Sequence, residues 1–327
     1  MTRINNKEKI AYIIAGAISA IVLPALMGYT KSDKFNVPHS QIPYCIVSPE
    51  LPTETEFAGE KIGLTRQDRR ERLDREILAF TYSHINTLLQ IKRANRLFPI
   101  VEPILKECNV PDDFKYLMII ESNGDIYARS AVGAAGLWQF MEKTAQQYGL
   151  EVNSYVDERY HIEKATRAAC EYLKESYNIY GDWLTVAASY NAGRNSINKR
   201  IENQKEQKAI NLQLVPETSR YIFRLLAVKN IFENPVKFGF IIQNRDLYPP
   251  LPIVKTIAIK KPVKCWAAMA KKHGLSFMQL REANPWIRST ELPNKNGNTY
   301  MVAIPDSAGL HYNPENTKTH NKKWVIK

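Results

Sequence analysis

The residues Tyr116-Leu-Met-Ile-Ile-Glu-Ser122 form an apolar run that ends in a single carboxylate, Glu121. Pro111 and two aspartates precede the run, which is typical of the first turn of a helix, and Asn123-Gly124 follow it. We therefore predict a helix that delivers Glu121 at its end. An apolar neighbourhood disfavours the ionised carboxylate, so Glu121 is a candidate general acid. The alternative is an ordinary surface glutamate at a helix end.

Two glycine-bounded segments further along the chain combine aromatic and amide side chains. They are Gly136-Leu-Trp-Gln-Phe-Met141 and Ala188-Ser-Tyr-Asn-Ala-Gly193. Sugar sites need apolar faces for the ring and amide or hydroxyl groups for its edges. Gln139 lies in an apolar run and needs a hydrogen-bond partner if it is buried. Trp138 suits a sugar platform and a core position equally well. Together with Glu121, these segments indicate a sugar-cleaving cleft.

Apolar residues elsewhere recur at helical spacing. From Thr65 to about Leu97 they predict one long amphipathic helix, which Pro99 is expected to end. The polar stretch 200–215 is expected to be a lid or surface loop. Further helices are predicted over 100–108, 141–148, 161–177, 182–190 and 217–232. The fold class is therefore mainly α, with a helical domain over 66–245 that the long helix precedes.

The remaining segments differ in composition. Residues 31–65 contain four prolines and are predicted to be an extended linker. After Pro249-Pro250, residues 251–306 read as a small α+β unit with the order strand-helix-helix-strand. Residues 307–327, rich in Asn, Lys and Thr, are predicted to be a flexible tail.

The N-terminus has the features of an export signal. Three basic residues precede an apolar stretch from Ile10 to Met27, which is about the length that spans a bilayer. The small-residue site Ala15-Gly-Ala17 would cut inside this stretch, which favours an uncleaved anchor over a removed signal. Residues 1–30 are therefore predicted to anchor the chain in the inner membrane, or to export it, with the remainder in the periplasm.

The charge is strongly basic and unevenly distributed. The formal net charge is +12, and residues 251–327 contain 13 Lys and Arg against 4 Asp and Glu. Such a surface favours polyanions, which include nucleic acid, anionic lipid and acidic wall polymer. Since no zinc-finger, P-loop or dinucleotide-binding pattern accompanies the charge, nucleic acid is not expected as a partner.

The cysteines and histidines show no metal-ligand spacing. We therefore expect no metal and no cofactor. The four cysteines allow three pairings in an exported chain, and Cys170 is expected to be a buried thiol. They are Cys45, Cys108, Cys170 and Cys265.

Four motifs in order resemble those of a known family. They are Glu121-Ser122, Gly136–Met141 with Thr144-Ala145, Ala187–Gly193, and Glu217-Thr218-x-x-Tyr221. Over about residues 95–235 the chain resembles lytic transglycosylases of the soluble-lytic-transglycosylase type. The resemblance implies a goose-lysozyme-like helical domain that acts on peptidoglycan glycan strands.

The resemblance also implies roles for single residues. Glu121 would act first as acid and then as base, cleaving between N-acetylmuramic acid and N-acetylglucosamine without water and forming a 1,6-anhydro ring. The positions expected to bind substrate or shape the site are Ser130, Gln139, Met141, Tyr190, Asn191 and Glu217.

The C-terminal unit resembles a diverged LysM module. The likeness rests on Leu280-x-x-Ala-Asn-Pro-Trp286 and Val302-Ala-Ile-Pro305. It implies binding to chains of N-acetylglucosamine. The basic charge of this unit offers a second role, attachment to anionic wall polymer or lipid.

The chain also departs from the family pattern. Asn123-Gly124 replaces a small residue and an aromatic one, Glu142 stands at a usual proline, and Arg194-Asn195 replaces a Pro-Gly pair. Two alternatives therefore stay open, a weakly active or non-catalytic wall-binding scaffold and a hydrolytic muramidase. The second would need Asp125 or another acid as a second carboxylate.

Overall fold

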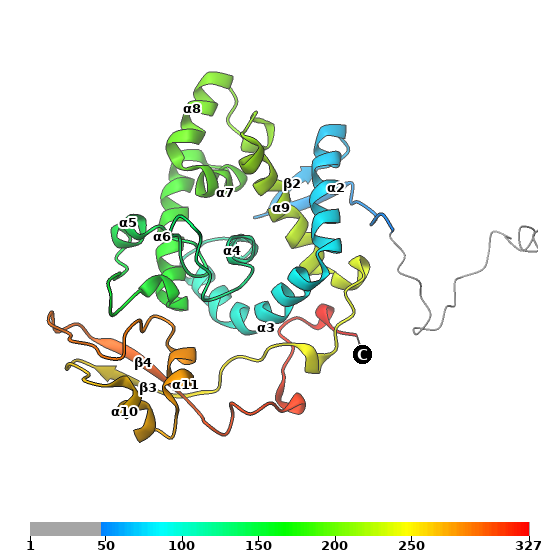
Figure 1. Cartoon of the computed structure of the whole chain (residues 1–327). Helices are drawn as coiled ribbons and strands as arrows, with labels where there is room; N and C mark the ends of the chain where they lie inside the picture. The colour runs from blue at the N-terminus through cyan, green and yellow to red at the C-terminus, as the bar shows by residue number, and fades with distance from the viewer. Residues whose placement is uncertain (1–46, 327) are drawn as a thin grey trace, which may run out of the picture. The chain divides into compact units, whose positions relative to one another are not determined.

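A computed structural model describes residues 47–326 of the chain (Figure 1). Its elements, in chain order, are β1 (Glu54–Phe57), β2 (Glu60–Gly63), α2 (Gln67–Tyr82), α3 (His84–Glu107), α4 (Phe114–Ser122), α5 (Glu142–Gln147), α6 (Ile162–Tyr180), α7 (Trp183–Ala192), α8 (Arg194–Gln204), α9 (Pro216–Glu233), β3 (Ile253–Ile259), α10 (Trp266–Lys272), α11 (Phe277–Ala283) and β4 (Tyr300–Pro305). The strands form two separate two-stranded sheets. The mainly α fold with a small α+β unit is therefore confirmed.

Helix α4 lies in the middle of the helical part (Figure 1). Seven of its nine residues are buried, and it packs against α3 and α9. Helix α9 is also largely buried and packs against α2 and α7. The apolar run before Glu121 is thus surrounded by other helices, which explains why it carries almost no polar residue.

The end of α4 is set by two residues in the left-handed conformation. Asn123 has φ 56° and Gly124 has φ 64°. Asparagine and glycine adopt this conformation more readily than other residues, so they end helices. The Asn123 N–H donates to Ile119 O at 2.8 Å, and its side-chain oxygen accepts from Gln90 Nε2 at 2.8 Å. Asn123-Gly124, which departs from the resemblance described above, therefore has a structural role, which is to end the helix at Ser122.

The single long helix predicted over residues 65–97 is wrong in two respects. The helix breaks at Ser83, where φ is −85° and ψ is 54°. Pro99 does not end the second part, because α3 continues through Pro99 and Pro103 to Glu107. The two prolines lie four residues apart on one exposed face. The carbonyl groups of Asn95 and Pro99, four residues before each proline, lose their usual backbone donor, and the helix nevertheless continues.

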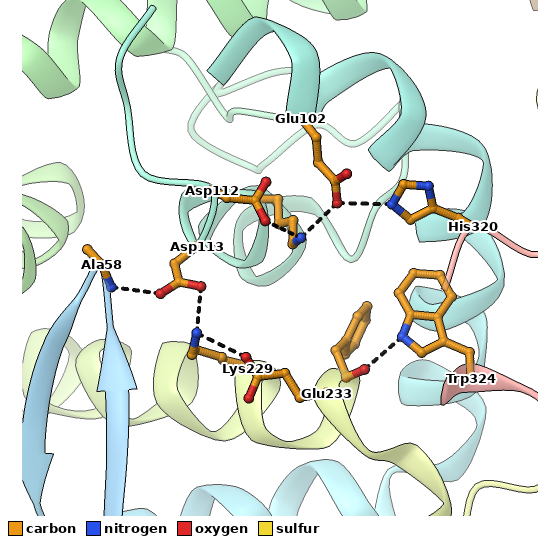
Figure 2. Close-up of polar contacts among 10 residues, drawn as sticks. Ala58, Glu102, Asp112, Asp113, Lys229, Glu233, His320 and Trp324 are labelled. Carbon is orange, nitrogen blue, oxygen red and sulfur yellow. Dashed lines mark hydrogen bonds and ion pairs between the residues drawn. The ribbon is translucent and has the colours of Figure 1, made fainter. Parts of the chain in front are cut away.

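The linker predicted over residues 31–65 is also wrong in its described part. Strands β1 and β2 form an antiparallel hairpin, with Phe57 paired to Glu60 across the turn. The Phe57 side chain is buried and contacts the Phe114 ring, with the ring centroids 5.4 Å apart. The Ala58 N–H donates to Asp113 Oδ2 at 2.7 Å (Figure 2). The hairpin is thus part of the helical domain.

The flexible tail predicted over residues 307–327 is contradicted by its described part. His320 lies 3.0 Å from Glu102, which also accepts from Lys115 Nζ at 2.7 Å. Further along, Trp324 is only 1% exposed, and its Nε1 donates to Phe232 O at 2.7 Å (Figure 2). The segment therefore packs onto the helical domain, since an indole with a hydrogen-bonded N–H can be buried fully.

Replacing Trp324 with alanine is expected to destabilise the protein by about 3–5 kcal/mol, because it opens a cavity beside the rings of Phe98 and Phe232. Urea unfolding measures the effect. Tyr312→Ala, in the same segment, removes an aromatic side chain that is 72% exposed and should change the free energy of unfolding little. Equal effects of the two changes would contradict the packed segment.

The C-terminal α+β unit has the predicted order of elements. Strands β3 and β4 pair antiparallel, with Ile259 opposite Tyr300 and a register shift between Ile253 and Lys255. Helices α10 and α11 pack on each other, and α11 contacts β4. Trp266 and Leu280 are buried in this small core.

Other expectations fall partly outside the described residues. The anchor predicted at 1–30 lies outside them, and within 47–326 no helix is long and apolar enough to cross a membrane. The stretch 200–215 is a loop only in part, since α8 continues to Gln204. Cys108, Cys170 and Cys265 carry free thiols, and Cys170 is buried as predicted. The described part contains no group of three or more ligating side chains suited to a metal.

Candidate active site

Glu121 is a half-buried carboxylate in the last turn of α4. Desolvation is the largest influence on it and raises its pKa from 4.5 to about 7. A hydrogen bond from Tyr221 and the positive charge of Arg224 act in the opposite direction, while the negative charge of Glu217 adds to the rise. At neutral pH the group is thus poised between its acid and its conjugate base, as a residue that must both give and take a proton requires.

Helix α9 supplies the partners of Glu121. The buried Tyr221 hydroxyl donates to Glu121 Oε1 at 2.5 Å. Glu217, Tyr221 and Arg224 occupy positions i, i+4 and i+7 and therefore share one face of the helix. Glu217 itself is exposed. The sequence predicts a role for Glu217, whereas the direct contact with Glu121 is made by Tyr221. The four-residue spacing between the two is the sequence signal that places Tyr221 on the same helix face.

The loop between α4 and α5 contains three of the predicted site residues. Ser130 Oγ accepts from the Ala134 N–H at 3.0 Å and so closes a turn of the loop. Gln139 has φ 48°, and its Nε2 donates to Gly136 O at 2.8 Å. Met141, just before α5, leaves 45% of its surface exposed. The amide of Gln139 has the partner that its position required, and that partner is the loop itself.

The indole of Trp138 is a core group and offers no sugar platform. Its side chain has no exposed surface, and its Nε1 donates to Thr166 Oγ1 at 3.0 Å. The backbone carbonyl of Trp138 accepts from the Tyr190 hydroxyl at 2.7 Å. Tyr190 thus joins the end of α7 to the loop, while its neighbour Asn191 is half-buried. Burial, followed by the charge of Glu121, raises the pKa of Tyr190 well above its ordinary value, so the group stays neutral.

Arg159, in the short turn Glu158–Tyr160, is hydrogen-bonded to the backbone of the same loop. Its guanidinium is 3% exposed and is bidentate to Asp157, with N–O distances of 2.9 and 2.7 Å. The remaining Nη1 donates to Gly133 O at 2.9 Å and to Phe140 O at 3.2 Å. The sequence assigns Asp157 and Arg159 no role, because nothing in their spacing shows that Arg159 reaches a loop some twenty residues earlier in the chain.

Removing the Tyr221 hydroxyl should raise the pKa of Glu121 further, because that hydrogen bond stabilises the ionised form. We expect the carboxyl carbon of Glu121 to titrate at higher pH in Tyr221→Phe than in the wild type, measured by carbon-13 NMR. Tyr190→Phe is the matched control, since the Tyr190 hydroxyl donates to Trp138 O instead. A titration of Glu121 in Tyr221→Phe that matches the wild type would contradict the contact.

Glu121→Gln should make the protein more stable above pH 7. The pKa of Glu121 is higher in the folded state than in the unfolded state, so binding of its proton stabilises the folded state. This contribution to stability is complete below about pH 4.5 and is lost as the pH rises to about 7. Glutamine carries no charge at any pH. We expect a gain of about 1–3 kcal/mol at pH 8 and little change at pH 4, measured by urea unfolding. A gain that does not depend on pH would argue against the buried charge.

Two regions of the chain match known protein families. Residues 99–213 match the family described as Transglycosylase SLT domain, and residues 255–308 match the family described as Soluble lytic transglycosylase C-terminal LysM-like domain. The first match covers Glu121, the loop and Tyr190, whereas α9 lies beyond its end.

Two curated relatives illustrate the similarity. Membrane-bound lytic murein transglycosylase D of Escherichia coli (strain K12) is 29% identical over 244 residues, which cover 72% of this chain and 52% of that protein. A putative tributyltin chloride resistance protein of Alteromonas sp. (strain M-1) is 31% identical over 112 residues, which cover 34% of this chain and 54% of that protein. The chain thus spans about half the length of the curated relatives it matches.

Proposed function

We propose that this chain, which carries an SLT transglycosylase domain and a LysM-like C-terminal domain, is a peptidoglycan lytic transglycosylase. It would cleave the β-1,4 bond between N-acetylmuramic acid and N-acetylglucosamine and leave a 1,6-anhydro ring on the muramic acid. The observation that carries the proposal is the environment of Glu121, which lies within the matched domain. Its carboxyl group is desolvated, has a pKa of about 7 and accepts a hydrogen bond from Tyr221.

The first step of the proposed reaction needs protonated Glu121. Its proton goes to the glycosidic oxygen, the bond between this oxygen and C1 of the muramic acid breaks, and N-acetylglucosamine leaves with the proton. Positive charge develops on the sugar ring while Glu121 becomes a carboxylate. The Tyr221 hydroxyl and the charge of Arg224 both favour that carboxylate, so they act when charge forms.

The second step returns the proton to Glu121. The carboxylate removes the proton of the C6 hydroxyl of the muramic acid, and the C6 oxygen forms a bond to C1. The sugar itself thus supplies the nucleophile, and the enzyme regains its starting state without water. A single group with a pKa near the working pH suits both steps, since neither transfer is then strongly uphill.

The remaining site residues form two groups, those with side chains exposed to a ligand and those whose polar groups bond to the loop. Met141 offers an exposed apolar side chain and Glu217 an exposed carboxylate, and with half-buried Asn191 they are proposed to touch the glycan. Ser130, Gln139 and Tyr190 use polar groups to shape the loop, so we propose that they form the wall of the site.

A hydrolytic muramidase is the second candidate function. Hydrolysis usually needs a second carboxylate to act as nucleophile or to activate water. Asp125 is the nearest acid along the chain, but one of its oxygens accepts from the Tyr127 N–H at 2.9 Å and the other lies 3.6 Å from Arg93. The carboxylate that influences the pKa of Glu121 is instead Glu217, which is exposed. A one-carboxylate mechanism is therefore the better supported reading.

Product analysis decides between the candidates. Purified sacculi are digested with the full chain, and the released fragments are analysed by mass spectrometry. Anhydro-muropeptides are expected. Muropeptides with reducing-end muramic acid would replace the proposal with a muramidase. Binding to sacculi without any release would support a non-catalytic scaffold.

The proposed location is the cell envelope, where this substrate lies. The name of the Escherichia coli relative describes a membrane-bound protein, and the apolar stretch Ile10–Met27 of this chain follows three basic residues. We propose that this stretch exports the chain and anchors it in the inner membrane. Fractionation of cells that express the full chain, with and without residues 1–30, tests the anchor.

A further inference from the structure

Two cysteines from different helices lie close together where α3 ends beside α6. Cys108 directly follows the last residue of α3, and Cys170 lies near the middle of α6. The two helices pack on each other. The Cys170 side chain is fully buried in the core of the helical domain, whereas Cys108 is half-buried and packs against that core. The reaction proposed above uses neither thiol.

An ion pair between neighbouring residues places the two cysteines opposite each other. Arg167 Nη1 and Nη2 donate to the two carboxylate oxygens of Glu107 at 3.0 and 2.8 Å. Glu107 directly precedes Cys108, and Arg167 lies three residues before Cys170 and so on the same face of α6. Apart from Leu173, the buried residues of α6 are small. Small side chains at a contact let the neighbouring helix approach closely.

The two thiols are also in contact. Burial is the largest cause of the raised pKa of the Cys170 thiol, and the charge of Cys108 and a hydrogen bond with it add to the rise. Thiols in hydrogen-bonding contact need only a small shift to form an S–S bond of about 2 Å. A single buried thiol would be an ordinary core group, whereas two in contact can be oxidised together. Cys265, the remaining described cysteine, is exposed at the start of α10 in the LysM-like domain.

We propose that Cys108 and Cys170 are joined by a disulfide bond when the chain is in the cell envelope. The location supplies the reason for oxidation, since disulfides form and persist in the periplasm and are rare in the cytosol. This part of the inference rests on the proposed function, whereas the contact between the thiols does not. Of the three pairings that four cysteines allow, the proposal selects the one that links neither Cys45 nor Cys265 to this pair.

The bond forms by exchange with a disulfide oxidant, such as glutathione disulfide or an oxidised thiol oxidoreductase of the periplasm. The more accessible Cys108 gives up its proton and attacks one sulfur of the oxidant, whose S–S bond breaks, and the released sulfur takes up that proton. The Cys170 sulfur then gives up its proton and attacks Cys108 Sγ. The mixed disulfide breaks, and the second oxidant sulfur leaves with the proton of Cys170. Two thiols of the chain are thus oxidised while one disulfide is reduced to two thiols.

The burial of Cys170 has two consequences for this bond. The second step should be the slower one, because a raised pKa leaves little thiolate to attack. Once formed, the bond presents a reductant with only the half-buried sulfur of Cys108. The closed ring of chain runs from residue 108 to residue 170 and contains Glu121, the loop between α4 and α5, and Arg159. The bond would therefore hold α3 and α6 together and restrict the unfolded chain.

Peptide mapping without reduction tests the pairing. The purified full chain is reduced, freed of reductant and divided, and one half is oxidised with glutathione disulfide. Remaining thiols in both halves are blocked with N-ethylmaleimide in denaturant. Trypsin cuts after lysine and arginine, so the bond would join the peptide 107–115 to the peptide 168–174. We expect mass spectrometry to detect this linked pair in the oxidised half only, and Cys108→Ser to abolish it.

Thermal unfolding shows whether the bond fits the native structure. Oxidation should raise the midpoint of the wild type by about 5–10 °C, because the crosslink lowers the entropy of the unfolded chain. Cys108→Ser should lose this rise and unfold close to the reduced wild type, since its side chain is only half-buried. Cys265→Ser is the matched control, because it removes an exposed thiol elsewhere and should keep both the linked pair and the rise.

The proposal is overturned if no linked pair forms, if either cysteine is found linked to Cys45 or Cys265, or if the oxidised and reduced wild type unfold at the same temperature. Chain taken from the cell envelope, with its thiols blocked before lysis, should contain the same linked pair, and two blocked thiols there would also overturn the proposal. The proposed reaction fails in a different experiment, the product analysis of sacculi, and the proposed location fails in the fractionation.

Discussion

Replacing Glu121 with glutamine is expected to lower the release of anhydro-muropeptides by a factor of about 10²–10⁴ or more, because it removes the only group proposed to transfer protons. Glutamine has nearly the same shape and can still accept from the Tyr221 hydroxyl. The loss would therefore report the missing proton and not a distorted site. The measurement is the initial rate of product release from sacculi, quantified by mass spectrometry.

The control for this change is Glu171→Gln, which alters an exposed carboxylate on α6 and should leave the rate unchanged. The pH dependence adds a second check. Since the first step needs protonated Glu121, the rate should fall as the pH rises above about 7. Activity that survives in Glu121→Gln would remove Glu121 from the mechanism, and a rate that keeps rising well above pH 7 would contradict its role as the acid.

Gly136→Ala is expected to have the largest effect on folding. Gly136 has φ 75°, and a Cβ atom at this position would lie 1.9 Å from Arg159 O and 2.7 Å from Arg159 C. These are backbone atoms, and the ion pair with Asp157 holds their residue in place. A shift of the backbone at Gly136 or at Arg159 would disturb the hydrogen bonds by which Arg159 holds the loop. We expect a loss of at least about 4 kcal/mol in the free energy of unfolding, or failure to fold.

Gly149→Ala is the control that separates the cost of the steric clash at Gly136 from the cost of a positive φ. Gly149 has a similar φ of 77°, but nothing lies within 4 Å of its added Cβ. It should therefore cost only about 1–2 kcal/mol, the usual cost of a left-handed residue with a side chain. Urea unfolding of both variants gives the difference. Similar losses would show that the approach of Gly136 to Arg159 does not matter.

Much of the candidate site was predictable because its residues lie in short, local patterns. Glu121 follows a buried apolar run, and burial of its own carboxyl group is the largest cause of its raised pKa. Gln139 was expected to need a partner, and it has one. The role of Trp138 was not predictable, because a tryptophan in a mixed segment fits a core and a sugar site equally well. Only its full burial and its hydrogen bond to Thr166 in the folded protein place it in the core.

Two of the errors in the fold, the hairpin and the C-terminal segment, share one physical cause. A β-hairpin with Ala58-Gly59 at its turn lacks the usual Asn-Gly signal, and its apolar residues are few. Residues 307–327 are rich in Asn, Lys and Thr, so their composition resembles that of a free tail. In both cases, burial depends on a surface that distant parts of the chain create. Local composition contains no information about such a surface.

By itself, the sequence determined the helical fold, the order of the α+β unit and the acid at the end of α4, because periodicity and turn chemistry are local properties. Only the tertiary structure decided which groups tune that acid, how Arg159 supports the loop, and where the C-terminal segment packs. It also decided that Val156 lies in the core of the LysM-like domain. These features join residues far apart in the chain, and their energies come from burial and charge in a shared environment that exists only once the chain has folded.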